Sequence, residues 1–311
     1  MIISASRRTD IPSCYSSWFF NRLKEGYVLV PNPFHTKSLS RISLKPEGID
    51  CIVFWTKNPA PMISRLPALQ DYRYYFQFTL NPYGNELESH LPSVAKRIET
   101  FKRLADLIGK ERVVWRYDPI LINPKYELSF HKEAFAHLAY ELREHTDQCM
   151  LGFIDHYRHL RQETRKRGIK PLLPEEIEEI AVSFRKTLVA SSIRLNTCTG
   201  KVNLSHLGIE AGMCIDRKRI EQLTGYPIVG RKDKNQRPVC NCIESIDIGT
   251  YESCLNGCVY CYAIKGNSRT VLDNRKRHDP QSPLLIGHVT EDEMIRDREM
   301  KSLRDDQFSL F

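Results

Sequence analysis

Three closely spaced cysteines near the end of the chain carry the strongest chemical signal. Cys254, Cys258 and Cys261 follow the spacing Cys-x3-Cys-x2-Cys in the stretch ESCLNGCVYCYA. Three thiolates on one tight loop suit three corners of a [4Fe–4S] cluster and would leave the fourth iron free for a non-protein ligand. Gly257 would allow a tight backbone between the first two ligands, and Tyr260 would shield the cluster. A zinc site, an electron-transfer iron–sulfur site and purely structural thiols remain alternatives, although structural zinc sites usually pair two short knuckles.

Four further cysteines could form a second metal site. Cys240 and Cys242 lie just upstream of the first group, Cys198 ends a predicted strand, and Cys214 lies in GIEAGMCID. Together they could bind an auxiliary iron–sulfur cluster or a zinc ion. Alternatively, one of these thiols could be a substrate-facing nucleophile or a hydrogen-atom donor. The remaining three cysteines are expected to be buried as small hydrophobic residues: Cys14, Cys51 and Cys149.

The elements that must position these cysteines alternate between strands and helices. Apolar and aromatic runs predict strands at residues 2–6, 51–57, 74–80, 112–117, 149–155, 192–198 and 244–249. Amphipathic spacing and terminal glycines predict helices at residues 16–26, 94–108, 130–145, 173–189 and 217–225. About seven β-units with helices between them favour an α/β fold with a parallel sheet. Residues 31–50 are expected to form an excursion, and the chain after about residue 265 is expected to be polar and irregular.

Polar residues follow the carboxyl ends of the predicted strands. They are Arg7, Arg8, Thr9 and Asp10, then Thr56, Lys57 and Asn58, then Thr79 and Asn81, then Arg116 and Asp118, then Asp155 and His156, then Asn196 and Cys198, and finally Asp247. In a barrel of parallel strands, this rim is where functional residues gather. Many strands end in polar residues, so only the recurrence in every unit indicates a site.

The pattern Cys-x3-Cys-x-Tyr-Cys resembles the signature of the radical S-adenosylmethionine (SAM) enzymes. The resemblance implies that Cys254, Cys258 and Cys261 hold a [4Fe–4S] cluster whose open iron binds the amino and carboxylate groups of SAM. It also implies that reduction, by a donor such as flavodoxin or ferredoxin, cleaves SAM to methionine and a 5′-deoxyadenosyl radical. In such enzymes the cofactor supplies the chemistry and the protein supplies its placement.

The position of the motif departs from that family, where it usually follows the first strand. The segments SASRRTDIP, IVFWTKNP, FQFTLNPYGNELE and VVWRYDPIL resemble successive later strands of spore-photoproduct-lyase-like radical SAM proteins. The chain therefore resembles a circularly permuted, partial (β/α) TIM-like barrel over residues 1–265, with the cysteine-rich segment 198–261 inside it and residues 266–311 as an extension. The overall pattern resembles the DUF1848 family. Permutation predicts that the first strand lies beside the last strand, which leads into the cysteines.

The resemblance also suggests which rim residues contact SAM. The candidates are Arg8, Asp10, Lys57, Gln77, Asn81, Arg116 and Asp118, with Tyr260 as an aromatic neighbour. An arginine could pair with the SAM carboxylate in a bidentate fork, and a carboxylate could accept hydrogen bonds from the ribose hydroxyls. For each of them an ordinary salt bridge is an alternative. The candidate catalytic residues are Arg116, Asp118 and Cys198.

Composition and charge bound the possible partners. The chain of 311 residues is 41% hydrophobic and 27% charged, which is ordinary for a globular protein. It has no apolar run of about 18 residues and no signal peptide at its start, so no membrane and a cytoplasmic location are expected. The net charge of +8 permits contact with nucleic acid, although scattered solvated charges are an equal alternative.

The last five residues, QFSLF, resemble the peptide with which bacterial repair proteins dock on the DNA sliding clamp. Leu310 and Phe311 would enter an apolar pocket while Gln307 fixes the register, unless the tail packs back on its own barrel. Together with the charge and the lyase-like strands, this tail favours radical repair or modification of nucleic acid. A radical SAM enzyme acting on a small molecule and a non-catalytic iron–sulfur or zinc protein that binds DNA are the alternatives.

Overall fold

A single parallel sheet organises the computed structural model, which describes residues 1–32, 35, 37–198, 202–266 and 268–305. Its strand order is β10-β1-β4-β5-β6-β7-β8-β9, and every neighbouring pair is parallel. The strands are β1 (Ile2–Ala5), β4 (Cys51–Thr56), β5 (Tyr74–Thr79), β6 (Val113–Ile120), β7 (Gln148–Phe153), β8 (Arg194–Cys198), β9 (Glu210–Gly212) and β10 (Ile246–Asp247). All seven predicted strands are present. The additional strand, β9, has three residues, too few for a periodic pattern to reveal it.

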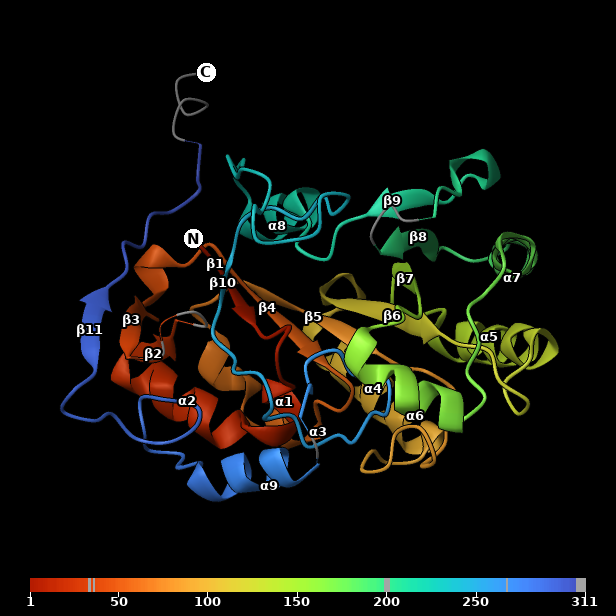
Figure 1. The fold of residues 1–311 in the computed structure, drawn as a ribbon. Coiled ribbons are helices and arrows are strands. Elements are labelled where there is room, and N and C mark those ends of the chain that lie inside the picture. The colour runs from red at the N-terminus through yellow and green to blue at the C-terminus, as the bar shows by residue number, and fades with distance from the viewer. Residues whose placement is uncertain (33–34, 36, 199–201, 267, 306–311) are drawn as a thin grey trace.

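Helices connect these strands and cover the sheet (Figure 1). They are α1 (Ile11–Cys14), α2 (Ser16–Glu25), α3 (Ala60–Ile63), α4 (Val94–Ile108), α5 (Leu128–Leu142), α6 (Arg161–Lys166), α7 (Pro174–Thr187), α8 (Arg217–Thr224) and α9 (Ser268–Arg277). The predicted glycine ends are confirmed for α2 and α8, where Gly26 and Gly225 adopt left-handed φ values of 78° and 79°. The Ser93 hydroxyl caps the start of α4 by accepting a hydrogen bond from the Lys96 backbone N–H.

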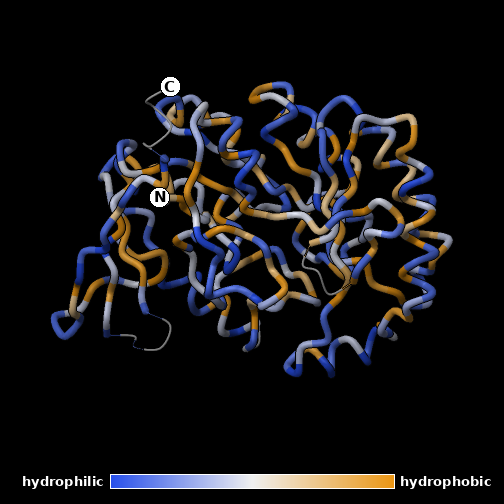
Figure 2. The backbone as a smooth tube through the Cα atoms, turned by 90° about the horizontal axis from the view of Figure 1, so that it is seen from above, coloured by the Kyte–Doolittle hydropathy of each residue, from blue (hydrophilic) through white to orange (hydrophobic). Residues whose placement is uncertain are grey.

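The two faces of the sheet pack against different parts of the chain. Side chains alternate along a strand, so Ile3 and Phe54 point into the larger core while Ile2 and Val53 point to the opposite face. The larger core includes apolar residues of α2, α4, α5 and α7, with the rings of Phe135 and Phe184 stacked 3.7 Å apart. Residues 213–243, including α8, cover the second face. Figure 2 shows the resulting orange interior segments and the blue outer loops.

The two ends of the chain's barrel-like region meet at one edge of the sheet. Strand β10 pairs with β1, with Ile246 opposite Ile3, as the resemblance to a permuted barrel predicts. Asp247 reinforces this pairing because its carboxylate accepts hydrogen bonds from the Ser4 hydroxyl at 2.7 Å and the Arg7 backbone N–H at 2.8 Å. The sheet is open, with β10 and β9 as its edge strands. The architecture is therefore an α/β fold compatible with a partial (β/α) barrel.

A second, smaller sheet joins the predicted excursion to the C-terminal segment. Strands β2 (Tyr27–Pro31) and β3 (Ser38–Ser43) are antiparallel, and β11 (Met294–Asp297) pairs with β3 in parallel. The expectation of an irregular chain after residue 265 is therefore wrong, because α9 and β11 lie there. The chain after α9 also packs against α2: the Trp18 indole N–H donates to the carbonyls of Ser282 and Leu284 at 3.0 and 3.1 Å.

Two of the sequence-based expectations concern a membrane and the DNA sliding clamp. No helix within the described ranges is both long enough and apolar enough to span a bilayer. The predicted clamp-binding tail, Gln307 to Phe311, lies outside the described residues.

Candidate functional site

A cavity of about 560 Å³ opens at the carboxyl ends of the parallel strands. Its lining includes the predicted rim residues Arg8, Asp10, Lys57, Arg116, Asp118 and Asp155, together with Tyr260 and seven cysteines: Cys198, Cys214, Cys240, Cys242, Cys254, Cys258 and Cys261. Parallel strands present their carboxyl ends at one edge of a sheet, which explains why residues so distant in sequence meet here. The structure thus brings these rim residues together around one cavity, and their role in a site stays a prediction.

The loop that carries Cys254, Cys258 and Cys261 is held in place by the loop that follows β5. The Val259 N–H donates to the Leu87 carbonyl at 3.0 Å, and the His90 N–H donates to the Asn256 carbonyl at 3.2 Å. Gly257 has a φ of +69°, a left-handed conformation that L side chains rarely adopt. The expected tight turn between the first two cysteines is therefore present.

Gly257→Ala should impair assembly of the cluster that the sequence predicts at this loop, because the added Cβ would strain the backbone and collide with the Ser89 hydroxyl oxygen. We expect less iron and sulfide per chain after anaerobic reconstitution. Gly225→Ala is the matched control, since Gly225 also has a positive φ but nothing lies within 4 Å of the added Cβ. Equal cluster content in the two variants would show that the close approach at Gly257 does not matter.

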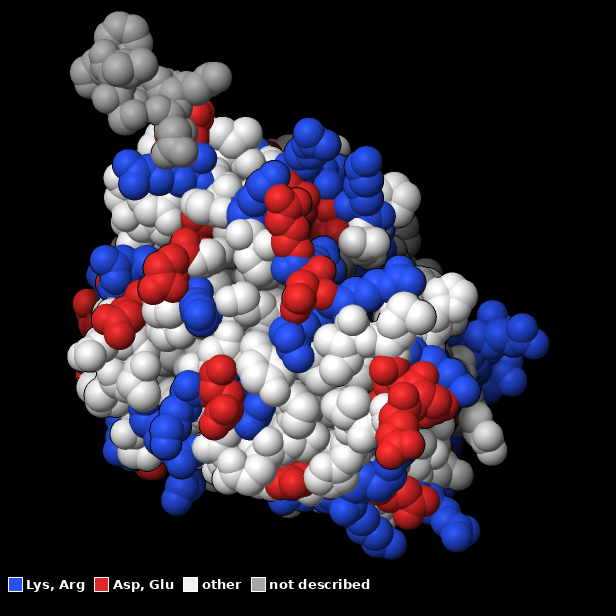
Figure 3. Space-filling model, turned by 90° about the vertical axis from the view of Figure 1, so that its left-hand side faces the viewer, with Lys and Arg blue, Asp and Glu red and all other residues white. Residues whose placement is uncertain are grey.

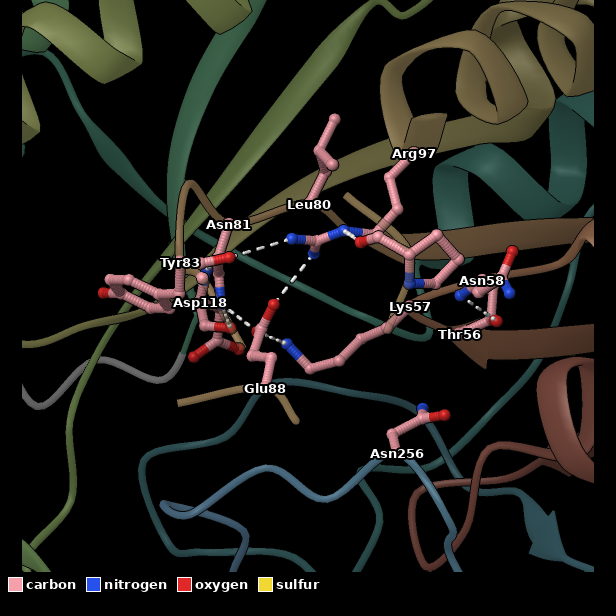
Figure 4. A network of polar contacts seen from close by, with 12 residues as sticks. Thr56, Lys57, Asn58, Leu80, Asn81, Tyr83, Glu88, Arg97, Asp118 and Asn256 are labelled. Atoms are coloured by element: carbon pink, nitrogen blue, oxygen red, sulfur yellow. Dashed lines mark hydrogen bonds and ion pairs between the residues drawn. The ribbon is translucent and has the colours of Figure 1, made fainter. Parts of the chain in front are cut away.

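A buried charge network lies beside the cysteine loop (Figure 4). Lys57 Nζ lies 2.7 Å from Glu88 Oε1, and Arg97 Nη1 lies 2.9 Å from Glu88 Oε2. The Tyr260 hydroxyl donates to Glu88, and Lys57 Nζ donates to the Tyr260 oxygen at 3.0 Å. The side chains of Glu88 and Arg97 are each only 1% exposed. Within this network two cations face one carboxylate, while the Asp10 carboxylate lies on the other side of the loop and raises the pKa of Cys254.

This charge acts on the pKa values of the thiols. Burial raises the pKa of Cys258 well above its ordinary value, and the Lys57 ammonium opposes that increase. Burial, and then the neighbouring Cys254, raise the pKa of Cys261 to about 12. The thiols therefore affect one another's pKa values across the cavity. At neutral pH they are protonated unless a bound metal replaces the protons.

Asp10 joins the cysteine loop to the first two strands of the barrel-like region. Its carboxylate accepts hydrogen bonds from the Lys57 N–H and the Asn256 amide, each at 2.7 Å, and from the Ser13 N–H at 2.9 Å. In this structure Asp10 is therefore a positioning residue, and its predicted contact with SAM ribose stays a prediction.

Cys14 lies beside the cysteine loop. The sequence indicates a small hydrophobic residue, but the structure places its thiol next to that of Cys254. The hydrogen bond with Cys14 is the first cause of a raised Cys254 pKa, followed by burial. Cys51 and Cys149, by contrast, are fully buried in the apolar cores as expected. Cys14 therefore has to be considered as a fourth thiol of the site.

The second group of cysteines forms a chain of thiol contacts. The sulfurs of Cys198 and Cys214 are 3.4 Å apart. Cys214 also contacts Cys242, which in turn contacts Cys240. The hydrogen bond with Cys242 lowers the pKa of Cys240 to about 7. The sequence-based grouping of these four residues is therefore reproduced in space.

Arg116 lies with this second group of cysteines. Its guanidinium donates to Cys214 Sγ at 2.8 Å, to Cys198 Sγ at 3.3 Å, and to Asp118. Gln77 is also engaged nearby, since its amide donates to the Cys214 carbonyl at 2.9 Å. Both residues therefore face the second cysteine group in this structure.

Two remaining SAM candidates have protein partners as well. Arg8 lies 3.9 Å from the Asp247 carboxylate and over the Tyr251 ring. The Asn81 amide joins β5 to β6, because it donates to the Asp118 carbonyl and accepts from the Asp118 N–H, each at 2.9 Å. Asn81 also donates to the Tyr260 hydroxyl at 3.2 Å. Their cofactor contacts stay predictions.

Thiolates are the donors that hold iron–sulfur clusters, and the cysteine loop supplies three of them. Within the described ranges, no three His, Cys, Asp or Glu side chains are arranged around one point as a bound metal ion requires, and this holds for both groups of cysteines. A cubane cluster places each thiolate on a separate iron, so its ligands are spread more widely than those of a single ion. Cys254, Cys258 and Cys261 line a common cavity, and a cluster at their loop stays a prediction.

A model of a known protein family matches most of the chain. The model of a domain of unknown function, DUF1848, matches residues 2–263. The chain belongs to this family. The searches of curated proteins and of solved structures returned no match.

The DUF1848 match ends just after the cysteine loop and includes all seven cavity cysteines. It therefore covers the large sheet and the whole candidate site, while α9 and β11 lie beyond it.

Four residues that organise the DUF1848 site were not predicted from the sequence: Cys14, Glu88, Arg97 and Asn256. Glu88 lies in a loop and Arg97 in the first turns of α4, so neither occupies a strand end. Asn256 lies between the cysteines, where the motif alone gives no reason to select it. A buried carboxylate between two cations is visible only once the fold brings them together.

Proposed function

We propose that this protein is a radical SAM enzyme whose [4Fe–4S] cluster is held by Cys254, Cys258 and Cys261. The observation that carries the proposal is the cysteine loop itself. Three thiols in the family-like spacing face one cavity at the carboxyl edge of a parallel sheet, beside the half-buried ammonium of Lys57. When bound, the reduced cluster would supply cleavage of SAM and an adenosyl radical that abstracts a hydrogen atom.

The protein's own residues would hold and shield this chemistry. The net positive charge of the Lys57, Glu88 and Arg97 network would offset the negative charge of thiolates next to it. Tyr260 would cover one side of the cluster, because its ring is only 8% exposed and its hydroxyl is fixed by Glu88. Asp10 and Asn256 would keep the cysteine loop against β1 and β4. Binding of the metal cluster would displace the thiol protons.

The test is to prepare the protein anaerobically, reconstitute it with iron and sulfide, and reduce it. A [4Fe–4S] EPR signal that shifts on addition of SAM, with formation of 5′-deoxyadenosine, supports an open iron. The reductant in the cell would be a flavodoxin or ferredoxin, so reduced flavodoxin should replace dithionite in this assay. A protein that takes up zinc in place of a cluster at this loop would overturn the radical mechanism.

Cys14→Ser should keep both the cluster and its response to SAM. The reason is that only three thiolates are needed for a cluster with an open iron, and Cys14 lies on α1 outside the cysteine loop. Iron content and the SAM-induced EPR shift are the measurements. Loss of the cluster in Cys14→Ser would instead indicate a closed site with four thiolates, which leaves no iron for SAM.

We propose nucleic acid as the substrate class, with repair or modification as the reaction. The net charge of +8 supports this proposal, as does the resemblance to spore-photoproduct-lyase-like strands. The face in Figure 3 intermingles Lys and Arg with Asp and Glu, so a DNA-binding surface would have to lie elsewhere on the molecule. Retention on DNA that weakens steeply with added salt would support this substrate class.

A small-molecule substrate is the second candidate. A cavity of about 560 Å³ lies within the range of small-molecule sites, and SAM would occupy part of it. Absence of DNA retention at low salt, together with SAM cleavage, would favour this candidate. DNA retention without SAM cleavage would favour a non-catalytic iron–sulfur or zinc protein. Docking on the sliding clamp through the QFSLF tail can be tested by removing Gln307 to Phe311 and measuring binding to the clamp.

A further inference from the structure

The second cysteine group has the features of a metal site separate from the cysteine loop. It joins three segments: Cys198 at the end of β8, Cys214 just after β9, and the pair Cys240 and Cys242 in the loop before β10. We infer that these four thiolates bind one zinc ion, which fastens residues 226–245 to the end of the sheet. This inference does not depend on the radical chemistry proposed for the other three cysteines.

The distances between the sulfurs favour a single ion over a cluster. With a Zn–S bond of about 2.3 Å, two sulfurs of a tetrahedral site lie about 3.8 Å apart. The Cys198 and Cys214 sulfurs are already 3.4 Å apart, and Cys242 Sγ accepts a hydrogen bond from the Cys214 N–H at 3.2 Å. Cys242 in turn contacts Cys240, so the sulfurs form a chain, and within the described ranges no three donor side chains yet surround one point. A cubane cluster would have to separate them, because each thiolate would bind a different iron. Binding of one zinc ion would require these four sulfurs to move from a chain into a tetrahedral arrangement.

Hydrogen-bond donors already surround the sulfurs. Cys242 Sγ accepts from the backbone N–H groups of Cys214 and Ile215 at 3.2 and 3.4 Å. The Arg116 guanidinium donates to Cys214 and Cys198, as described above. Donors of this kind stabilise thiolates, since hydrogen bonds to charged acceptors are the stronger ones. They are also the second-shell contacts that orient metal ligands.

The surrounding charge matches a zinc–tetrathiolate site. Four thiolates and one Zn²⁺ carry a net charge of −2, and burying that charge is costly unless cations lie nearby. Arg116 is only 6% exposed, and the guanidinium of Arg7 lies within electrostatic range of Cys242 and Cys214. Both arginines also pair with a carboxylate, Arg116 with Asp118 and Arg7 with Asp233 at 3.4 Å, so they would offset the charge of the site in part. Binding of Zn²⁺ by four thiols releases four protons and involves no change of oxidation state.

The loop of residues 226–245 gives a structural reason for a zinc site at this place. Between α8 and β10, residues 226–245 form only isolated bridges, Ile228 with Arg304 and Lys232 with Ile243, within the part of the chain that the structure describes. Long loops without regular structure are uncommon in compact domains. A tetrathiolate zinc would fix the end of this loop, as structural zinc does in small domains. It would thereby shape one wall of the cavity that the cysteine loop also lines.

The first test is the metal content of the full chain, measured by elemental analysis after purification without added iron. We expect about one zinc per chain. In Cys214→Ser and Cys242→Ser zinc should fall at least tenfold, whereas the matched control Cys258→Ser should retain it. Replacement by Co²⁺ should give the intense thiolate-to-metal absorption and visible bands of a tetrahedral thiolate site.

A second measurement needs no variant and so survives a variant that fails to fold. Titrating the wild-type protein with an organomercurial reagent should release the zinc as the thiols react, as followed with a metallochromic dye. Three results would overturn the inference: no zinc in the wild-type protein, zinc that depends on Cys258 but not on Cys214, or about eight irons per chain after reconstitution. A disulfide between Cys198 and Cys214 in the native protein, detected by mass spectrometry, would overturn it as well.

Discussion

Cys258→Ser should reduce the proposed SAM cleavage to the rate of a protein-free control. Cys258 is the middle thiol of the loop and lies close enough to Lys57 for that charge to oppose the rise of its pKa, so its loss removes one of the three proposed cluster ligands. Serine cannot replace it well, because iron–sulfur clusters are held by thiolates. The measurements are iron and sulfide content, the EPR spectrum of the reduced protein with and without SAM, and 5′-deoxyadenosine formed under reducing conditions.

The matched controls are cysteines close to the same loop: Cys242 lines the cavity, and Cys14 lies beside Cys254. Cys14→Ser places the same substitution next to the loop and should leave SAM cleavage intact, while Cys242→Ser should change zinc content without removing the EPR signal. Cleavage of SAM by Cys258→Ser at the wild-type rate would exclude the cysteine loop as the cluster site. Loss of cleavage in Cys242→Ser with the cluster intact would instead place the second group of thiols in the reaction.

Glu88→Gln should lower the free energy of unfolding by about 3–5 kcal/mol at neutral pH, the usual cost of removing one partner from a buried ion pair. The substitution keeps the shape of the side chain but leaves the buried Arg97 and the half-buried Lys57 without a carboxylate between them. Urea denaturation followed by tryptophan fluorescence measures the change. Glu86→Gln is the control, since Glu86 lies two residues away in the same loop but pairs with Lys125 at the surface. Such exposed pairs contribute little.

The destabilisation should depend on pH in a defined direction. Burial by itself raises the pKa of Glu88, but the charges of Lys57 and Arg97 outweigh it and hold that pKa below its ordinary value. The stabilisation is therefore complete above the unfolded-state pKa of about 4.3 and is lost as the pH falls through the lower folded-state pKa. The difference between wild type and Glu88→Gln should be constant near pH 7 and shrink below about pH 4. A difference that grows on acidification would mean that Glu88 is protonated in the folded protein at neutral pH.

Local patterns in the sequence were sufficient for the main elements of the fold. Apolar runs identified the seven strands, and the glycines at the ends of α2 and α8 marked the helix boundaries correctly. Each of these signals depends on residues adjacent in the chain. Several elements were missed: the short helices α1, α3 and α6, the strands β2 and β3, the strand β9, which is too short for a periodic pattern, and α9 and β11. The polar helix α9 has only Val271 buried, so it lacks an apolar face that a pattern could reveal.

The sequence by itself determined the residue types of the site, and the tertiary structure decided their partners. The spacing of Cys254, Cys258 and Cys261 and the polar rim are local facts, because they depend on order along the chain. Whether Cys14 is an inert core residue or a neighbour of Cys254 depends on how α1 packs, which no local pattern encodes. The same holds for Glu88 between two cations and for Arg116 against two thiols. Burial and charge neutralisation arise only when distant segments meet, and for that reason these contacts became visible only in the folded protein.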